Sequence, residues 1–155
     1  MKNGGDIATF RGEHVDECAR LLVSIFNGKP WNEHRDLQTV KQELSWALDV
    51  PEFIGFVCLS FNEVVGFIIG SYEGQGVDKK FHLIDLGVRA DVQGRGIGNR
   101  LLKHLENTIE ATNTTSIYLT TRKGSPAQSF YEKNGYRVDS GDIALWPKVS
   151  MVRNL

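Results

Sequence analysis

The chain has 155 residues, of which 41% are hydrophobic and 24% charged, and its formal net charge is −1. This length and balance predict one globular domain over residues 1–155, and the near-zero charge argues against a general electrostatic grip on nucleic acid or on anionic membranes. No apolar run reaches signal-peptide or membrane-spanning length, so a cytoplasmic protein is expected. The two cysteines and four histidines lack metal-ligand spacing, and no metal site is expected.

Hydrophobic periodicity and turn residues divide the chain into strands and helices. In chain order, the expected elements are a strand at 6–12, helices at 13–26 and 37–48, strands at 52–60, 64–74 and 79–88, a helix at 97–109, a strand at 115–122, a helix at 125–135, and strands at 136–141 and 143–154. The strands at 52–60 and 64–74 flank a tight turn and therefore form an antiparallel hairpin. The near-continuous apolar character of 79–88 predicts a central strand, and the two C-terminal strands leave an edge that could support a homodimer. The order β-α-α-β-β-β-α-β-α-β-β predicts an α+β fold with a mixed, mostly antiparallel central sheet flanked by helices.

The segment DVQGRGIGNR, residues 91–100, concentrates glycines between a strand that ends at Val88 and a helix that begins near Gly96. A helix entrance carries unpaired N–H groups and a partial positive charge, and glycines let an anion approach them, so a phosphate or pyrophosphate site is predicted. The ATP/GTP P-loop pattern is absent, and the dinucleotide pattern G-x-G-x-x-G fails because Asn99 and Leu101 stand where glycine would be needed. A glycine-rich turn with only a mechanical role is the alternative interpretation.

Two segments resemble the signatures of the GNAT superfamily of acyl-CoA-dependent N-acyltransferases. In LGVRADVQGRGIGNRLL, the pattern Q/R-x-x-G-x-G/A is matched by Gln93, Gly96 and Gly98. SPAQSFYEKNGYRV is similar to the second signature through Ala127, Phe130, Tyr131, Gly135 and Tyr136. The resemblance implies a GNAT-like fold over nearly the whole chain. It also implies direct transfer of the acetyl group of acetyl-CoA to a primary amine. The acceptor is expected to be a small molecule, with an aminoglycoside-like compound as one option, or a peptide.

The resemblance further implies roles for individual residues. The expected coenzyme A contacts are Leu86, Gly87, Val88, Gln93, Gly94, Arg95, Gly96, Ile97, Gly98, Asn99 and Ser125. The amide of Val88 would stabilise a tetrahedral oxyanion. Tyr131 stands where the family has its general acid, and the alternative is an aromatic side chain packed in the core. Gly124 departs from the family, in which asparagine is common at this position, so one side-chain contact to the cofactor is in doubt.

A general base is expected on the strand at 79–88. Strict alternation would place His82, Ile84, Leu86 and Val88 on one face and Phe81, Leu83, Asp85 and Gly87 on the other. Relatives carry a carboxylate or histidine four or six residues before the valine. Ile84 cannot act as a base, so His82 is the candidate, with a locally bonded histidine as the alternative. Asp85 is interpreted as a helix-packing or supporting carboxylate.

The acceptor is expected to enter beside GKPWNEHRD, residues 28–36. The candidate acceptor-binding residues, which suit a cationic amine, are Trp31, Glu33, Asp36 and Glu73. The same stretch could instead be a solvated loop anchored by its tryptophan. Two other functions compete with the enzyme: a catalytically silent acyl-CoA sensor, which would not need Tyr131, and a nucleotide- or phosphate-binding interaction module, which would leave the second signature unexplained.

Overall fold

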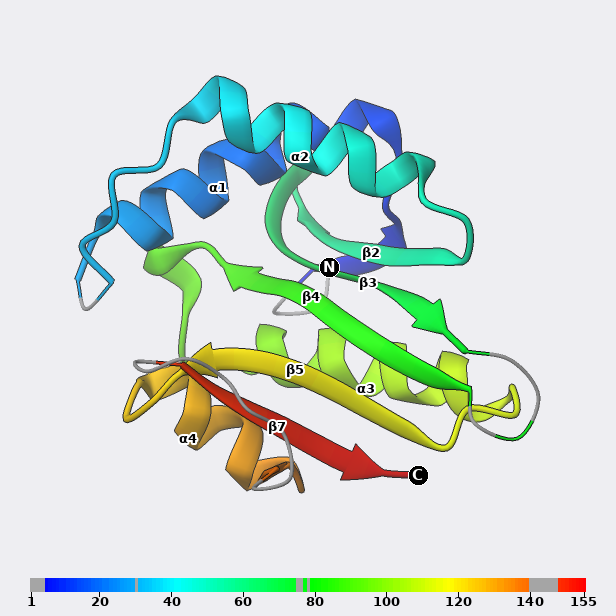
Figure 1. The fold of residues 1–155 in the computed structure, drawn as a ribbon. Coiled ribbons are helices and arrows are strands. Elements are labelled where there is room, and N and C mark those ends of the chain that lie inside the picture. The colour runs from blue at the N-terminus through cyan, green and yellow to red at the C-terminus, as the bar shows by residue number, and fades with distance from the viewer. Residues whose placement is uncertain (1–4, 30, 75–76, 78, 140–147) are drawn as a thin grey trace.

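The computed structural model describes residues 5–29, 31–74, 77, 79–139 and 148–155, and Figure 1 shows how they are arranged. The strands are β1 (Asp6–Thr9), β2 (Phe53–Ser60), β3 (Glu63–Glu73), β4 (Lys80–Val88), β5 (Ser116–Arg122), β6 (Arg137–Val138) and β7 (Lys148–Asn154). The helices are α1 (Val15–Asn27), α2 (Leu37–Asp49), α3 (Ile97–Glu110) and α4 (Pro126–Lys133). The predicted element order and α+β class are confirmed, and the short 3₁₀ turns η1 (Gly12–His14) and η3 (Ala90–Val92) are additional.

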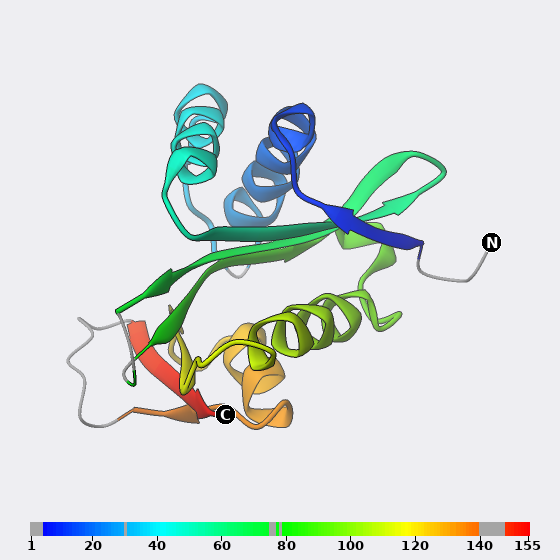
Figure 2. The same cartoon turned by 90° about the vertical axis from the view of Figure 1, so that its right-hand side faces the viewer.

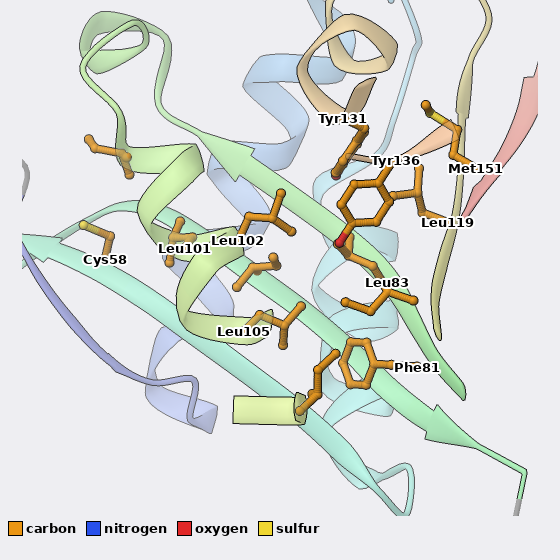
Figure 3. Packing of buried hydrophobic residues seen from close by; sticks show 14 of the residues in the cluster. Cys58, Phe81, Leu83, Leu101, Leu102, Leu105, Leu119, Tyr131, Tyr136 and Met151 are labelled. Carbon is orange, nitrogen blue, oxygen red and sulfur yellow. The ribbon is translucent and has the colours of Figure 1, made fainter. Parts of the chain in front are cut away.

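The strands form one sheet in the order β1-β2-β3-β4-β5-β7-β6, and helices cover both faces (Figure 2). Helices α1 and α2 pack on one face, where α1 buries Cys18, Ala19, Leu21 and Leu22. Helices α3 and α4 pack on the other, where the apolar stripe of α3 buries Leu101, Leu102, Leu105 and Ile109. Figure 3 shows part of this second cluster, with Tyr131 and Tyr136 beside Leu83 and Leu119. The amphipathic helices and the apolar sheet therefore bury one core on each side of the sheet.

The C-terminal region differs in its boundaries from the prediction. The strand expected at 136–141 is the two-residue β6 among the described residues, and residues 140–147, which include the end of that strand and the start of the strand expected at 143–154, lie outside the described residues. Among the described residues, the edge at this end of the sheet is therefore short. Beside it, the Tyr136 hydroxyl donates a 2.9 Å hydrogen bond to Glu106, whose carboxylate also pairs with Arg153 at 2.6 Å. This buried network ties α3 to β7 and to the chain that leaves α4. No helix within the described part of the chain is long and apolar enough to cross a membrane.

The strands β4 and β5 are parallel but pair over only three positions. The pairs are Lys80 with Ser116, Phe81 with Ile117, and His82 with Tyr118. Beyond His82 the two strands diverge, as Figure 1 shows toward the C-terminal ends of both strands. The divergence leaves one edge of β4, from Leu83 onward, without a neighbouring strand. A central strand with an open edge is a site where another extended chain can form main-chain hydrogen bonds.

A bulge in β4 overturns the predicted alternation of its side chains. Asp85 pairs with Ile69 and Leu83 pairs with Gly70, so Ile84 is an extra residue with no partner on β3. The faces therefore exchange at Ile84: Leu83 and Leu86 both contact the core on the α3 side. A Cβ on Gly87 would instead meet Leu21 and Phe67 on the α1 side. The prediction that His82, Leu86 and Val88 share one face is wrong, because it assumed a regular strand.

Candidate active site

The segment from the end of β4 to the first turn of α3 lines a cleft of about 580 Å³, which we call the glycine cleft. Nine of the predicted cofactor contacts line it: Leu86, Gly87, Val88, Gln93, Gly94, Gly96, Ile97, Gly98 and Asn99. Gly94 and Gly96 have φ values of +79° and +84°, and a Cβ added to either would meet no protein atom within 4 Å. Glycine is therefore required there by backbone conformation and leaves space for a ligand.

The entrance of α3 presents backbone N–H groups to the glycine cleft. Gly96 caps the helix without a side-chain hydrogen bond, and the first N–H within the helix to find an acceptor is that of Arg100, which donates to the Gly96 carbonyl at 3.0 Å. The preceding N–H groups of the first turn lack such acceptors, as at any helix start. The Gln93 side chain donates to the Val88 carbonyl at 2.8 Å and so holds the loop against the end of β4. This arrangement suits a phosphate or pyrophosphate group.

Two predicted cofactor contacts lie outside the glycine cleft. Arg95 is exposed and is absent from the cleft lining. Ser125 is buried and caps α4: its hydroxyl accepts a hydrogen bond from the Gln128 amide at 3.2 Å and donates to the Arg122 carbonyl at 2.6 Å. Ser125 is therefore the N-cap of α4, and it positions that helix and Tyr131 within it.

The open edge of β4 directs main-chain groups into the gap between β4 and β5. The Arg89 amide donates to the Val65 carbonyl on β3 at 2.8 Å. Because N–H groups alternate between the two edges of a strand, those of Val88 and Leu86 point the other way, toward the gap. Both residues line the glycine cleft. Their amides and the Leu86 carbonyl are therefore available to an extended ligand arm that continues from the helix entrance, while the Val88 carbonyl already accepts the bond from Gln93.

A second cleft, of about 450 Å³, opens between the diverging strands, and we call it the β4–β5 cleft. Its lining residues are Ile25, Phe26, Trp31, Glu33, Arg35, Leu83, Ile84, Asp85, Leu86, Leu119, Thr120, Thr121, Arg122, Ala127, Tyr131 and Lys148. Both clefts include Ile25, Trp31, Leu86, Ala127 and Tyr131. The two clefts therefore meet beside Tyr131, and groups bound in them come together there.

Tyr131 projects from α4 to the junction of the two clefts. It is only 6% exposed, and its ring packs edge-on against Phe130 and against Tyr136, the second of which Figure 3 shows beside it. Its hydroxyl has no hydrogen-bond partner among the described residues. Burial raises the pKa of Tyr131 above its usual range, and the nearby carboxyl of Asp85 raises that pKa further. The phenol is therefore protonated at neutral pH and can donate a hydrogen bond or a proton into the junction.

Asp85, which the sequence predicted only as a helix-packing or supporting carboxylate, lines the β4–β5 cleft. Protein atoms crowd its carboxyl while the cleft leaves it partial solvent contact, and this burial raises its pKa to about 7. The Arg35 charge opposes that rise and the Glu43 charge adds to it. A carboxyl group with a pKa near neutrality can accept a proton and release it again. Asp85 lies in this cleft because of the bulge at Ile84, and no residue pattern in the sequence indicates that bulge.

His82 lies outside the lining of both clefts. Its ring stacks on Tyr118 with 4.6 Å between ring centroids, and its Nδ1 lies 3.5 Å from Glu73. Burial lowers the pKa of His82 below its ordinary value, and the Glu73 charge partly offsets that effect. Glu73 also accepts a 2.5 Å hydrogen bond from the Tyr118 hydroxyl, and it too is absent from both linings. These three residues form a small cluster on the paired part of β4 and β5.

Of the remaining acceptor candidates, Trp31 and Glu33 line the β4–β5 cleft, whereas Asp36 does not. Asp36 is the N-cap of α2 and accepts a 3.0 Å hydrogen bond from the Thr39 amide, which lowers its pKa. The Trp31 ring packs edge-on against Phe26 at 5.3 Å. The described residues contain no group of three or more histidine, cysteine or acidic side chains arranged to hold a metal ion.

Comparisons with known proteins agree with this geometry. A model described as the acetyltransferase (GNAT) family matches residues 15–136. An acetyltransferase of Sodalis glossinidius (strain morsitans) is 30% identical over 141 residues, which are 90% of this chain and 92% of that protein. A solved GNAT-family acetyltransferase of Staphylococcus aureus Mu50 superposes with a TM-score of 0.80 at 23% identity, over 97% of this chain and 98% of that chain.

A second solved structure, an aminoglycoside 6'-N-acetyltransferase complexed with coenzyme A, superposes with a TM-score of 0.73 at 21% identity, over 96% of each chain. At such identities the solved structures establish the fold alone. The family model spans most of the chain, and the curated relative covers nine-tenths of it. The chain therefore belongs to the acetyltransferase (GNAT) family.

Proposed function

We propose that the protein is an N-acetyltransferase that moves the acetyl group of acetyl-CoA directly to a primary amine. The observation that carries this proposal is the meeting of the two clefts at Tyr131, beside the open edge of β4. The glycine cleft fits the donor, because its backbone N–H groups suit a pyrophosphate and the edge of β4 suits an extended amide-containing arm. The β4–β5 cleft then receives the acceptor amine.

When bound, acetyl-CoA supplies an activated thioester, and the chain's own groups handle charge and protons. The N–H groups of Leu86 and Val88 hold the donor arm, and that of Val88 also stabilises the negative charge on the carbonyl oxygen during attack. Asp85 accepts the proton that the amine loses as its nitrogen bonds to the carbonyl carbon. Tyr131 donates a proton to the thiolate sulfur as the carbon–sulfur bond breaks. No covalent enzyme intermediate is needed, so the reaction is a single transfer between two bound substrates.

Asp85 is proposed as the base in preference to His82 because it lines the acceptor cleft and faces the same junction as Tyr131. Its pKa near 7 keeps a useful fraction of carboxylate at neutral pH while leaving that carboxylate basic enough to take a proton. His82 would have to act through solvent from outside the cleft. A comparison of pH profiles, described in the Discussion, separates the two.

The proposal is tested by measuring free thiol released from acetyl-CoA with a panel of primary amines. Isothermal titration with coenzyme A, AMP and ATP comes first, since only a donor site of the proposed kind prefers coenzyme A. We expect coenzyme A to bind at micromolar levels and at least one amine to stimulate thiol release. Failure to bind coenzyme A, or binding without acetylation of any amine, would overturn the proposed function.

A further inference from the structure

The β4–β5 cleft is lined by more positive than negative side chains. Its lining includes three cations, contributed by Arg35, Arg122 and Lys148, against the two carboxyl groups of Glu33 and Asp85. Glu33 is already paired with Arg35, with 3.4 Å between carboxylate oxygen and guanidinium nitrogen. Within the described parts of the chain, no carboxylate forms an ion pair with Arg122 or Lys148. Among the described residues, these two positive charges therefore have no carboxylate partner.

The sheet itself gives no reason for these two cations. Arg122 at the end of β5 lies directly opposite Lys148 at the start of β7 in the antiparallel register, and both side chains are exposed. Like charges in opposite positions on neighbouring strands repel and destabilise the pair. An anionic ligand bound between the two side chains would offset this repulsion.

The Arg122 side chain is directed over the cleft. Its Nη1 lies 3.5 Å from the carbonyl oxygen of Trp31, which belongs to the segment on the opposite wall. The guanidinium thus extends from β5 toward the loop before α2. A guanidinium carries five N–H donors, so most of them stay available to a ligand beneath it.

Only a few residues of strand separate Asp85 and Arg122 from the last rung at which β4 and β5 pair. The last paired rung between the strands is His82 with Tyr118. Asp85 follows His82 by three residues on β4, and Arg122 follows Tyr118 by four residues on β5. One compact molecule can therefore face the Asp85 carboxyl with one end and the Arg122 guanidinium with the other.

We propose that the acceptor is a small amine that also carries an anionic group, a carboxylate or a phosphate, which Arg122 and Lys148 bind while the amine faces Asp85. This inference rests on the proposed acetyl transfer. Guanidinium groups bind both anions through paired N–H donors. A polycationic acceptor such as an aminoglycoside would bring like charges against Arg122 and Lys148. The cleft therefore disfavours polycationic amines, which an acidic cleft would favour.

The test compares matched acceptors at saturating acetyl-CoA. The twenty amino acids are paired with their amides, which keep the amine and side chain but lose the carboxylate. Aminoalkyl phosphates are paired with the corresponding amino alcohols, and kanamycin represents the polycations. We expect the best acceptors to be anionic, with kcat/KM at least about 10-fold above the neutral partner. The two sets of pairs distinguish a carboxylate from a phosphate.

Variants assign the effect to Arg122 and Lys148. Arg122→Gln is expected to lower kcat/KM for the best anionic acceptor by about 10- to 100-fold, mainly through KM, and to change its neutral partner by less than about 3-fold. Lys148→Gln should do the same more weakly, and Arg122→Lys should restore part of the loss. Lys123→Gln is the matched control, since Lys123 adjoins Arg122, is exposed and lines neither cleft.

Each outcome has a definite meaning. Preference for anionic acceptors that is lost in Arg122→Gln but kept in Lys123→Gln supports the inference. If neutral or cationic amines are the best acceptors, or if Arg122→Gln lowers both members of a pair equally, the inference is overturned while acetyl transfer stands. If coenzyme A binds but no member of the panel is acetylated, the proposed function itself fails.

Discussion

The two clefts that meet at Tyr131 are built in opposite ways. One continuous segment, from the end of β4 to the start of α3, supplies most of the glycine cleft, and it offers backbone N–H groups. The β4–β5 cleft draws side chains from the segment before α2, from both diverging strands, from α4 and from the start of β7. A donor common to many enzymes can thus be bound by a short local motif. The β4–β5 cleft, where we propose that the acceptor binds, is assembled from distant side chains, each of which can change independently.

The largest effect is expected from filling the glycine cleft. Gly96→Val should lower coenzyme A affinity by about 100-fold or more, because its side chain would enter the cleft and the left-handed conformation at φ +84° would be strained. Isothermal titration measures the loss. Gly124→Val is the matched control, since Gly124 has φ +75°, similar open space and no place in either cleft. Equal loss of affinity in both variants would show that strain alone is responsible.

Removing the hydroxyl at the junction should affect chemistry and leave binding intact. Tyr131→Phe is expected to lower kcat by about 100-fold with little change in coenzyme A affinity, because the leaving thiolate loses its proton donor. Steady-state kinetics and titration measure the two effects. Tyr136→Phe serves as control: it removes the hydrogen bond to Glu106 and should lower stability by about 1–3 kcal/mol without altering the pH profile. Unchanged kcat in Tyr131→Phe would remove the acid role.

The base is identified by the acidic limb of the pH profile. If Asp85 takes the proton, kcat/KM rises with pH through about 7, and Asp85→Asn should lose this limb together with about 10- to 100-fold in rate. The acceptor amine adds its own limb at higher pH in every variant. His82 has a pKa below its ordinary value, so a histidine base would place the limb lower. His82→Gln is therefore expected to keep the limb near 7, and its loss in that variant would return the role to His82.

The smallest expected effect is on protein stability and comes from Asp85 in the β4–β5 cleft. Burial raises the pKa of Asp85 from 3.8 to about 7, so ionising this carboxyl opposes folding. The contribution of the protonated carboxyl to the free energy of unfolding is fully present below pH 3.8 and is lost as pH rises through about 7. Asparagine does not ionise. The free energy of unfolding of Asp85→Asn, relative to that of the native chain, should therefore rise by on the order of 2 kcal/mol from pH 5 to pH 8. Urea denaturation at the two pH values measures the gain, and an equal difference at both would contradict the raised pKa.

The glycine cleft could be predicted closely because its determinants are local. The spacing of Gly94, Gly96 and Gly98 indicated a helix entrance with free N–H groups, and nine of eleven expected contacts line that cleft. Arg95 and Ser125 are the exceptions. Side-chain direction on an exposed turn depends on what surrounds it, and the Ser125 hydroxyl is occupied in capping α4.

By itself, the sequence determined the order of elements, the sheet class and the glycine-rich helix entrance that we expect to bind an anion, since these follow from periodicity and from glycine conformation over short stretches. Only the tertiary structure decided which side chains line the β4–β5 cleft. The bulge at Ile84 turned Asp85 into the β4–β5 cleft, and the divergence of β4 and β5 opened that cleft beside Arg122. The physical reason is that register and strand divergence depend on pairing between residues far apart in the chain, which no local pattern records.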